Sequence, residues 1–275
     1  RAIPFVDIYY HIFLTLQPGA TEVEYEGLLT TLRRFRNRFS EQDRWAMHKY
    51  AQNFCIRKMN LGDHAYAHRL FALYQELLEE KILLFNGQLA HTEYKNITTT
   101  GIRVKALDWV ESFMERYREY VIEEFRDNVY TFCRASLEVE KGNTPLAIRL
   151  LHRISHTDVH YQISARQLLA RIYFQVDDLE GLLYTIQAYR YFLKRNREIT
   201  KSRRQANLSF LTLLKSLALL RDRLPTYGPK KQNMLLLKFW ERLQKADSLA
   251  NRGWLVEAFE GVADQTTYPF DMRST

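Results

Sequence analysis

Histidines at a four-residue spacing are the residues of this chain best suited to metal chemistry. His64 and His68 would share one helix face, a geometry that can chelate zinc. A second series steps by the same interval: His152, His156 and His160. The first pair has no further ligand nearby except Asp63, and a turn at residues 155–158 should break the second series. We therefore expect these histidines to be polar residues between helices, with no metal and no cofactor.

Carboxylates could supply acid and base catalysis, but here they occur as adjacent pairs: Glu79-Glu80, Glu123-Glu124 and Asp177-Asp178. Side chains of neighbouring helical residues diverge by about 100°, so an adjacent pair cannot act together as acid and base. Glycine-rich phosphate loops are absent from the sequence, as are HExxH, paired CxxC and GxSxG motifs. We expect no enzyme activity in these residues.

The basic run KRNREITKSRR, residues 194–204, has two alternative interpretations. It could bind an anion such as nucleic acid, or it could be a solvated corner between two helices. The run begins a block, residues 194–245, that contains 14 Lys and Arg and only three Asp and Glu. The net charge of the whole chain is +8. Cations are favourable at a helix C-terminus and unfavourable in the first turn of the next helix unless an anion is near. The candidate anion site therefore narrows to Lys201, Arg203 and Arg204.

An earlier basic run, RRFRNRF at residues 33–39, interleaves arginines with Phe35 and Phe39, as in proteins that stack on bases. Both phenylalanines continue the apolar helical stripe of Leu28 and Leu32, so we expect them to be buried and the arginines to face solvent.

Composition favours a helical, folded chain. Of 275 residues, 46% are hydrophobic, and 10 Gly and six Pro are too few for the many turns of an all-β fold. The two cysteines, Cys55 and Cys133, lie in apolar helical patterns, so we expect buried, reduced thiols. Without a signal segment or an apolar run of about 18 residues, a cytoplasmic location is the default expectation.

Helix starts recur along the chain, and they predict an all-α fold of about a dozen helices over residues 1–262 with an irregular tail at residues 263–275. Thr21 should cap one helix and Ser40 the next. That second helix should stop at Gly62, and the following one should run to about Leu84 before Asn86-Gly87 reverses the chain. Further helix starts are expected at Pro145, at Thr157 or Asp158, and at Thr200.

One hairpin, ARQLLARIYFQVDDLEGLLYTIQAY at residues 165–189, has a repeat-like spacing. Ala170 and Tyr173 lie on its first helix, and Leu182 and Ile186 on its second. The spacing resembles the tetratricopeptide repeat, with weaker copies aligned at three earlier positions: Ala67, Val110 and Ala147. The runs CIRKMNLGD, YKNITTTGIR and FLKRNREIT also resemble a group of repeat proteins from Bacteroidetes, a likeness that implies no activity.

The resemblance implies an α-solenoid of antiparallel hairpins whose first helices line a concave groove. The repeat phase would place these residues in the groove: Lys95, Arg103, Phe132, Arg171 and Gln175. Lys95 and Asn96 resemble part of the clamp with which some members of the family hold a peptide's terminal carboxylate, although the full set cannot be assembled here.

Three interpretations follow. The preferred one is a non-catalytic scaffold that binds a protein or peptide segment in the groove, without a membrane partner. The second is a helical nucleic-acid or anion binder that uses the block at residues 194–245. The third, suggested by a start at Arg1 rather than Met, is a sensor or oligomerisation arm of a longer protein. The tail, which contains Tyr268 and Phe270, could occupy the groove.

Overall fold

The computed structural model describes residues 3–155 and 158–265, and this part of the chain contains 13 α-helices and a single short β-hairpin. The expected all-α fold with about a dozen helices is confirmed. Contacts divide the chain into two compact units, residues 1–154 (unit 1) and residues 155–275 (unit 2). His156, Thr157 and residues 266–275 of the predicted tail lie outside the described residues.

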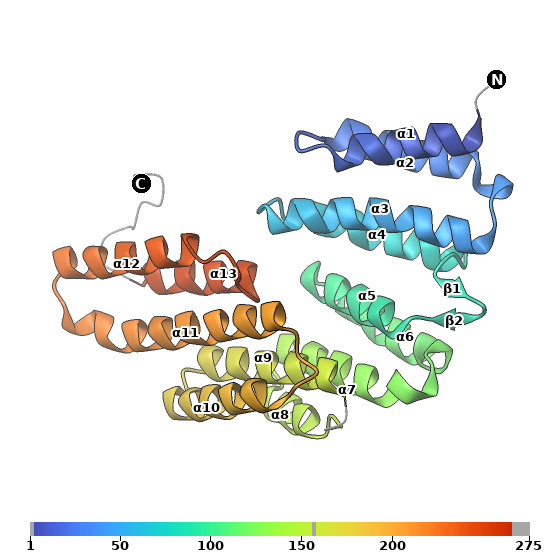
Figure 1. Ribbon diagram of the computed structural model, residues 1–275. Coiled ribbons are helices and arrows are strands. Elements are labelled where there is room, and N and C mark those ends of the chain that lie inside the picture. Colours follow the sequence, from blue (N-terminus) through green and yellow to red (C-terminus); the bar gives the residue numbers. More distant parts are fainter. Residues whose placement is uncertain (1–2, 156–157, 266–275) are drawn as a thin grey trace. The chain divides into compact units, whose positions relative to one another are not determined.

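Unit 1 contains eight α-helices, two 3-10 turns and the β-hairpin: α1 (Pro4–Leu16), α2 (Glu22–Arg34), η1 (Arg36–Arg38), α3 (Glu41–Asn60), α4 (Tyr66–Glu79), β1 (Leu84–Phe85), β2 (Gln88–Leu89), α5 (His91–Arg103), α6 (Leu107–Tyr117), η2 (Arg118–Tyr120), α7 (Glu123–Glu140) and α8 (Thr144–His152). The helices pair in chain order as α1 with α2, α3 with α4, α5 with α6 and α7 with α8. Each pair also contacts the next, as Figure 1 shows.

The predicted helix starts in unit 1 are confirmed by their caps. The Thr21 hydroxyl accepts from the backbone N–H of Val23, and the Glu24 carboxylate accepts from the N–H of Thr21 to close a capping box. The Ser40 hydroxyl accepts from the N–H of Asp43. Pro145 lies in the first turn of α8, where its missing N–H costs nothing.

Two predicted helix ends were wrong. α2 ends at Arg34, so Phe39 does not continue its stripe and instead packs edge-on against Phe5 of α1, with ring centroids 4.6 Å apart. α4 ends at Glu79 rather than near Leu84, because residues 84–89 pair as a β-hairpin. Its turn at Asn86 and Gly87 has φ of 51° and 74°, left-handed values that these two residue types tolerate.

Unit 2 contains five α-helices and one 3-10 turn: α9 (Val159–Gln175), α10 (Leu179–Arg195), α11 (Lys201–Arg223), η3 (Leu224–Thr226), α12 (Pro229–Gln244) and α13 (Arg252–Ala263). The long helix α11 contacts α10, α12 and α13, and α9 pairs with α10. The predicted caps Asp158 and Thr200 both accept a backbone N–H.

A polar cluster fixes three helices of unit 2 in its core. Asn207 of α11 is 1% exposed, and its Oδ1 accepts from Gln167 of α9 and from the hydroxyl of Tyr189 of α10, both at 2.6 Å. Its amide nitrogen donates to the carbonyl of Arg203. A buried amide whose oxygen and nitrogen are both hydrogen-bonded specifies the mutual register of the helices that contribute to it.

Candidate functional site

Helix α5 lies at the centre of unit 1 and packs on three sides. Its back is close to α4 and α6, because a Cβ built on Gly101 would lie only 2.4 Å from Cγ2 of Val110 and 3.0 Å from Cε2 of Phe71. One flank meets α3, where the buried Glu93 pairs with Lys49. The other flank meets α7, where the Lys95 ammonium lies 4.8 Å from the ring centroid of Phe132. One face of α5 is left uncovered.

The uncovered face of α5 carries four residues at helical spacing: Thr92, Asn96, Thr99 and Arg103. They fall within an arc of about 60° on a helix of 3.6 residues per turn, so they form one stripe. Thr92, Asn96 and Arg103 are exposed and Thr99 is half-buried. The Arg103 guanidinium lies 3.2 Å from Nδ1 of His64, which follows α3.

Helix α3 contributes a neighbouring stripe of exposed amides. Gln42 and Asn53 lie within about 40° of Lys49 on the helix, and Lys49 points toward α5. The side chains of Gln42, Asn53 and Asn96 make no hydrogen bond within the described residues. We call the combined surface of α3 and α5 the amide face; its members are Gln42, Asn53, Thr92, Asn96, Thr99 and Arg103.

An ion pair under the amide face joins α3 to α5. Glu93 is 2% exposed, and the side chain of Lys49 is one-quarter exposed and also lies 4.7 Å from the ring centroid of Trp45. Burial lowers the pKa of Lys49 to about 8, so the ammonium still predominates at neutral pH. A removal of either charge would leave the other one poorly solvated.

The structure brings together two of the groove residues that the repeat phase predicted in unit 1. Lys95 and Phe132 contact each other between α5 and α7, and Phe132 is 7% exposed, so its ring serves mainly as packing for the ammonium. Arg103 lies on the same helix as Lys95 and belongs to the exposed stripe. Sequence reasoning did not single out Gln42, Asn53 or Thr92, although polar residues opposite an apolar helical stripe are the pattern that would find them.

The predicted groove residues of unit 2 both lie on α9. Arg171 is half-buried, and its guanidinium carbon lies 5.0 Å from the ring centroid of Trp254 on α13. Gln175 is exposed and is the last residue of α9. Arg171 therefore packs between helices of unit 2, while Gln175 is open to solvent.

The predicted anion-site residues lie in the first turn of α11 but have different partners. The Arg204 guanidinium donates to the carbonyls of Leu193, Asn196 and Ile199, at 2.8, 2.9 and 3.2 Å. Arg203 donates to Nδ1 of His160 at 2.5 Å. The Lys201 side chain is exposed and makes no ion pair within the described residues. Arg204 thus satisfies carbonyl groups at the end of α10, and Lys201 is the cation most open to an anion.

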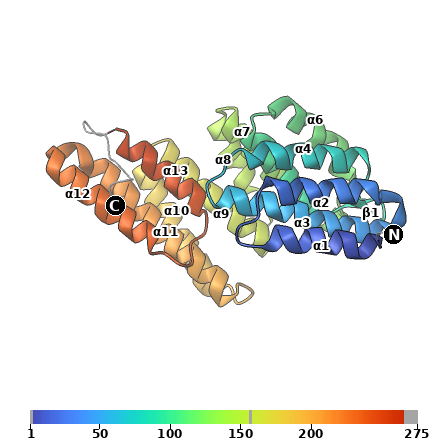
Figure 2. The same cartoon turned by 90° about the horizontal axis from the view of Figure 1, so that it is seen from above.

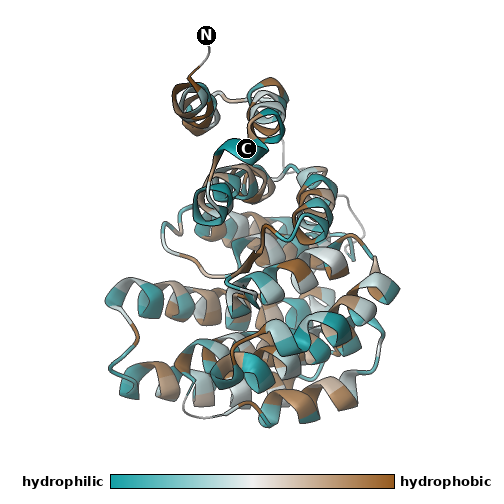
Figure 3. Cartoon of the chain, turned by 90° about the vertical axis from the view of Figure 1, so that its right-hand side faces the viewer, coloured by the Kyte–Doolittle hydropathy of each residue, from teal (hydrophilic) through white to brown (hydrophobic). Residues whose placement is uncertain are grey.

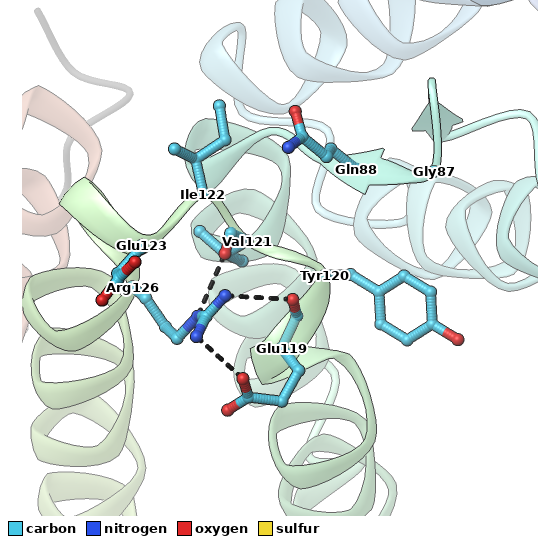
Figure 4. A pocket seen from close by; sticks show the side chains of 8 residues that line it. All are labelled: Gly87, Gln88, Glu119, Tyr120, Val121, Ile122, Glu123 and Arg126. Carbon is cyan, nitrogen blue, oxygen red and sulfur yellow. Dashed lines mark hydrogen bonds and ion pairs between the residues drawn. The ribbon is translucent and has the colours of Figure 1, made fainter.

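An open pocket of about 720 Å³ lies beside the β-hairpin of unit 1 (Figure 4). It is lined by Gly87, Gln88 and residues 119–123, with Arg126 on one side. The Arg126 guanidinium pairs with the Glu119 carboxylate and donates to the carbonyls of Glu119 and Val121. These contacts engage all three guanidinium nitrogens of Arg126, and the Glu119 carboxylate neutralises its charge, so the pocket offers a ligand little free charge.

The structure separates the histidines considered for metal binding. The expected break in the second series is present, since α8 ends at His152 and α9 begins at Val159. The arrangement of His64 and His68 differs from expectation. α4 begins at Tyr66, so His64 precedes the helix and does not share a helical face with His68. Among the described residues, no three His, Cys, Asp or Glu side chains are grouped to hold a metal ion.

No helix in the described part of the chain combines the length and apolarity needed to cross a membrane. Comparison with protein-family models, with curated proteins and with solved structures finds no match to this chain.

Proposed function

We propose that this chain is a tetratricopeptide-like helical-repeat scaffold that binds an extended peptide segment on the amide face. The observation that carries the proposal is a row of exposed polar side chains on α3 and α5. The amides of Gln42, Asn53 and Asn96 and the hydroxyl of Thr92 make no hydrogen bond within the described residues. A side-chain amide offers two donors and an acceptor, which match the N–H and C=O groups of an extended backbone. Hairpins that pack in chain order, as in unit 1, support a solenoid.

The cations beside the amide face suggest where an acidic group of the peptide would lie. Arg103 ends the exposed stripe of α5, and Lys95 lies on the flank toward α7 over Phe132. A carboxylate near either one would gain a charge-assisted hydrogen bond. In unit 2 the same proposal assigns the exposed Gln175 to the corresponding helix face, with Arg171 beside it held against Trp254.

A displayed random-peptide library, selected on the 275-residue chain, tests this function directly. Peptides that are enriched should bind with a dissociation constant that rises at least about tenfold when Asn96 and Arg103 are both changed to alanine, the loss of two good hydrogen bonds. The matched control changes Asn37 and Arg38, which are exposed residues of the same types, both in η1. Equal loss in both variants, or no enriched peptide, would contradict the proposal.

A second candidate function, nucleic-acid binding by unit 2, is favoured by the distribution of charge. Residues 155–275 contain 19 Lys and Arg against 12 Asp and Glu, a net charge of +7, whereas residues 1–154 contain 21 against 20. Three exposed cations of α12 and the one that follows its last residue fall within an arc of about 60° and have no carboxylate partner among the described residues: Lys231, Lys238, Arg242 and Lys245. We call them the α12 basic stripe.

Fluorescence anisotropy with labelled single-stranded RNA tests the second candidate. Changing all four residues of the α12 basic stripe to glutamate should abolish measurable binding at 100 mM salt, because each cation lost removes one phosphate contact. A control variant alters net charge equally by placing glutamate at four exposed cations of unit 1: Arg38, Lys81, Arg116 and Arg149. If the control loses as much affinity, the stripe is not the site.

A further inference from the structure

Helix α1 is apolar on almost every side. Its sequence is PFVDIYYHIFLTL, in which Asp7, His11 and Thr15 are the polar residues. One face, with Ile8 and Ile12, is buried against α2 and α3, as Figure 2 shows for the three helices. In Figure 3 the helix next to the N label is brown over most of its turns. A helix that is hydrophobic all round is ordinarily buried all round.

The outer face of α1 is nevertheless exposed. Six large side chains on it are 48–63% exposed and span an arc of about 140°: Phe5, Val6, Tyr9, Tyr10, Phe13 and Leu16. We call them the α1 outer face. A fully buried aromatic side chain covers roughly 200 Å², so six half-exposed side chains present on the order of 600 Å². This equals or exceeds the largest apolar patch of a typical monomer and approaches the ~800 Å² that each partner buries in a stable interface.

We propose that a second copy of this chain covers the α1 outer face, with the two α1 helices packed antiparallel about a two-fold axis. Two-fold contacts need a surface that is complementary to itself. In an antiparallel register centred between Tyr9 and Tyr10, Tyr9 of one chain lies opposite Tyr10 of the other. Val6 of one chain then lies opposite Phe13 of the other. A small side chain then faces a large one at each end of the contact.

Charge also permits this pairing. The α1 outer face holds no ionisable carboxylate, ammonium or imidazole, so two identical copies bring no like charges together. Asp7 and His11 lie off the face, and both are only partly exposed. The repeat arrangement supplies the same kind of contact inside unit 1, where α1 already packs on α3 of the next hairpin. A two-fold pair of N-terminal hairpins would continue that packing.

Light scattering coupled to size exclusion tests the proposal on the 275-residue chain. The expected mass is twice the 32.9 kDa of one chain, and Phe13→Glu should halve it while leaving the helical circular dichroism unchanged. The control is Tyr184→Glu, which alters a 75% exposed aromatic residue of α10 and should leave the mass doubled. A single-chain mass for the unmodified protein at all concentrations, or a doubled mass for Phe13→Glu, would overturn the proposal.

Cysteine cross-linking tests the register. Val6→Cys in one chain faces Phe13→Cys in the other, so a mixture of the two variants should form a disulfide-linked pair under mild oxidation. Each variant alone should not, because equivalent positions lie seven residues apart along the axis, about 10 Å, beyond the ~7 Å Cα separation that a disulfide tolerates. Efficient cross-linking of Val6→Cys with itself would indicate parallel helices and overturn the antiparallel arrangement.

Discussion

Cys55 and Cys133 are fully buried free thiols, as the apolar helical patterns around them predicted. Burial raises the pKa of Cys55 to about 11 and that of Cys133 to about 12, so neither forms a thiolate at pH 8. We expect no reaction with a chromogenic disulfide reagent at pH 8 in the native protein and two thiols per chain in denaturant. Rapid reaction of either thiol without denaturant would show that it is accessible.

The same thiols predict a pH dependence of stability. Their folded pKa values lie above the ordinary value of 9.0, so their contribution is intact below pH 9 and is lost as pH rises toward 11–12. Urea unfolding should show a free energy of unfolding that falls between pH 9 and pH 10. The double variant Cys55→Ala with Cys133→Ala should fall less steeply over this interval; an identical slope would assign the loss to other groups.

The Lys49 to Glu93 pair is a further residue-scale feature. Glu93→Gln keeps the shape of the side chain but leaves the Lys49 ammonium beside a neutral group, so we expect a destabilisation of about 2 kcal/mol, less than the ~3–5 kcal/mol of a fully buried pair. Adding Lys49→Met should recover part of the loss, because no unpaired charge remains. Glu79→Gln, at an exposed position, is the control for urea unfolding and should change stability by less than about 0.5 kcal/mol. If the effects of Glu93→Gln and Lys49→Met on the free energy of unfolding are additive, the two side chains are not energetically coupled.

At the scale of elements, Arg204 joins the end of α10 to the start of α11. Its guanidinium donates to three carbonyls of residues 193–199, and hydrogen bonds from a charged donor contribute about 1.5–3 kcal/mol each in favourable cases. We expect Arg204→Ala to lower the free energy of unfolding by about 2 kcal/mol. Arg204→Lys should not restore the lost stability, since one ammonium group cannot reproduce the planar arrangement of guanidinium donors that reaches three carbonyls.

Lys201→Ala is the matched control for Arg204, since it removes an exposed cation one turn earlier on the same helix. We expect a change within about 0.5 kcal/mol, as for other unpartnered surface residues. Equal effects at the two positions in chemical denaturation would mean that the carbonyl contacts of Arg204 add nothing to stability.

At the scale of the whole molecule, residues 155–275 carry a net charge of +7. The dependence of RNA affinity on salt concentration therefore tests whether this charge contacts phosphate groups. If the α12 basic stripe contacts RNA, the logarithm of the association constant should fall linearly with the logarithm of salt concentration, with about 0.7 of slope per cation engaged. Changing only Lys238 and Arg242 to alanine keeps two of the four cations, so binding stays measurable and the slope should fall by about 1.4 units. Anisotropy titrations at several salt concentrations measure it, and an unchanged slope would place the contact elsewhere.

Helix starts were easier to predict from the sequence than short strands. Caps at Thr21, Ser40, Asp158 and Thr200 were predicted correctly, because a capping side chain acts on backbone groups two or three residues away. The chain reversal at Asn86-Gly87 was predicted, but the β-hairpin that forms it at residues 84–89 was not. Its strands have two residues each, and such short pairings depend on the elements around them more than on their own pattern.

The amide face likewise combines features that the sequence predicted with features that only the structure shows. The repeat phase predicted Lys95 and Arg103 as groove residues; on α5, Arg103 belongs to the exposed stripe and Lys95 lies on the flank toward α7. Which polar residues of α3 lie next to them required the contact of Lys49 with Glu93, residues 44 positions apart in the chain. Arg204 is the clearest case. The five other basic residues of the run 194–204 suggest an anion site, whereas its actual partners are carbonyls at and just after the end of α10.

The sequence by itself determined the all-α class, most helix starts, the burial of the thiols and the concentration of charge toward the C-terminus. These properties follow from local backbone chemistry and from helical periodicity, which act over a few residues. Only the tertiary structure decided which face of α5 is open, which cations are already bonded, and that α1 carries apolar side chains on a side that no described helix covers. Those outcomes depend on which helices pack together, and packing joins residues that are far apart in the chain.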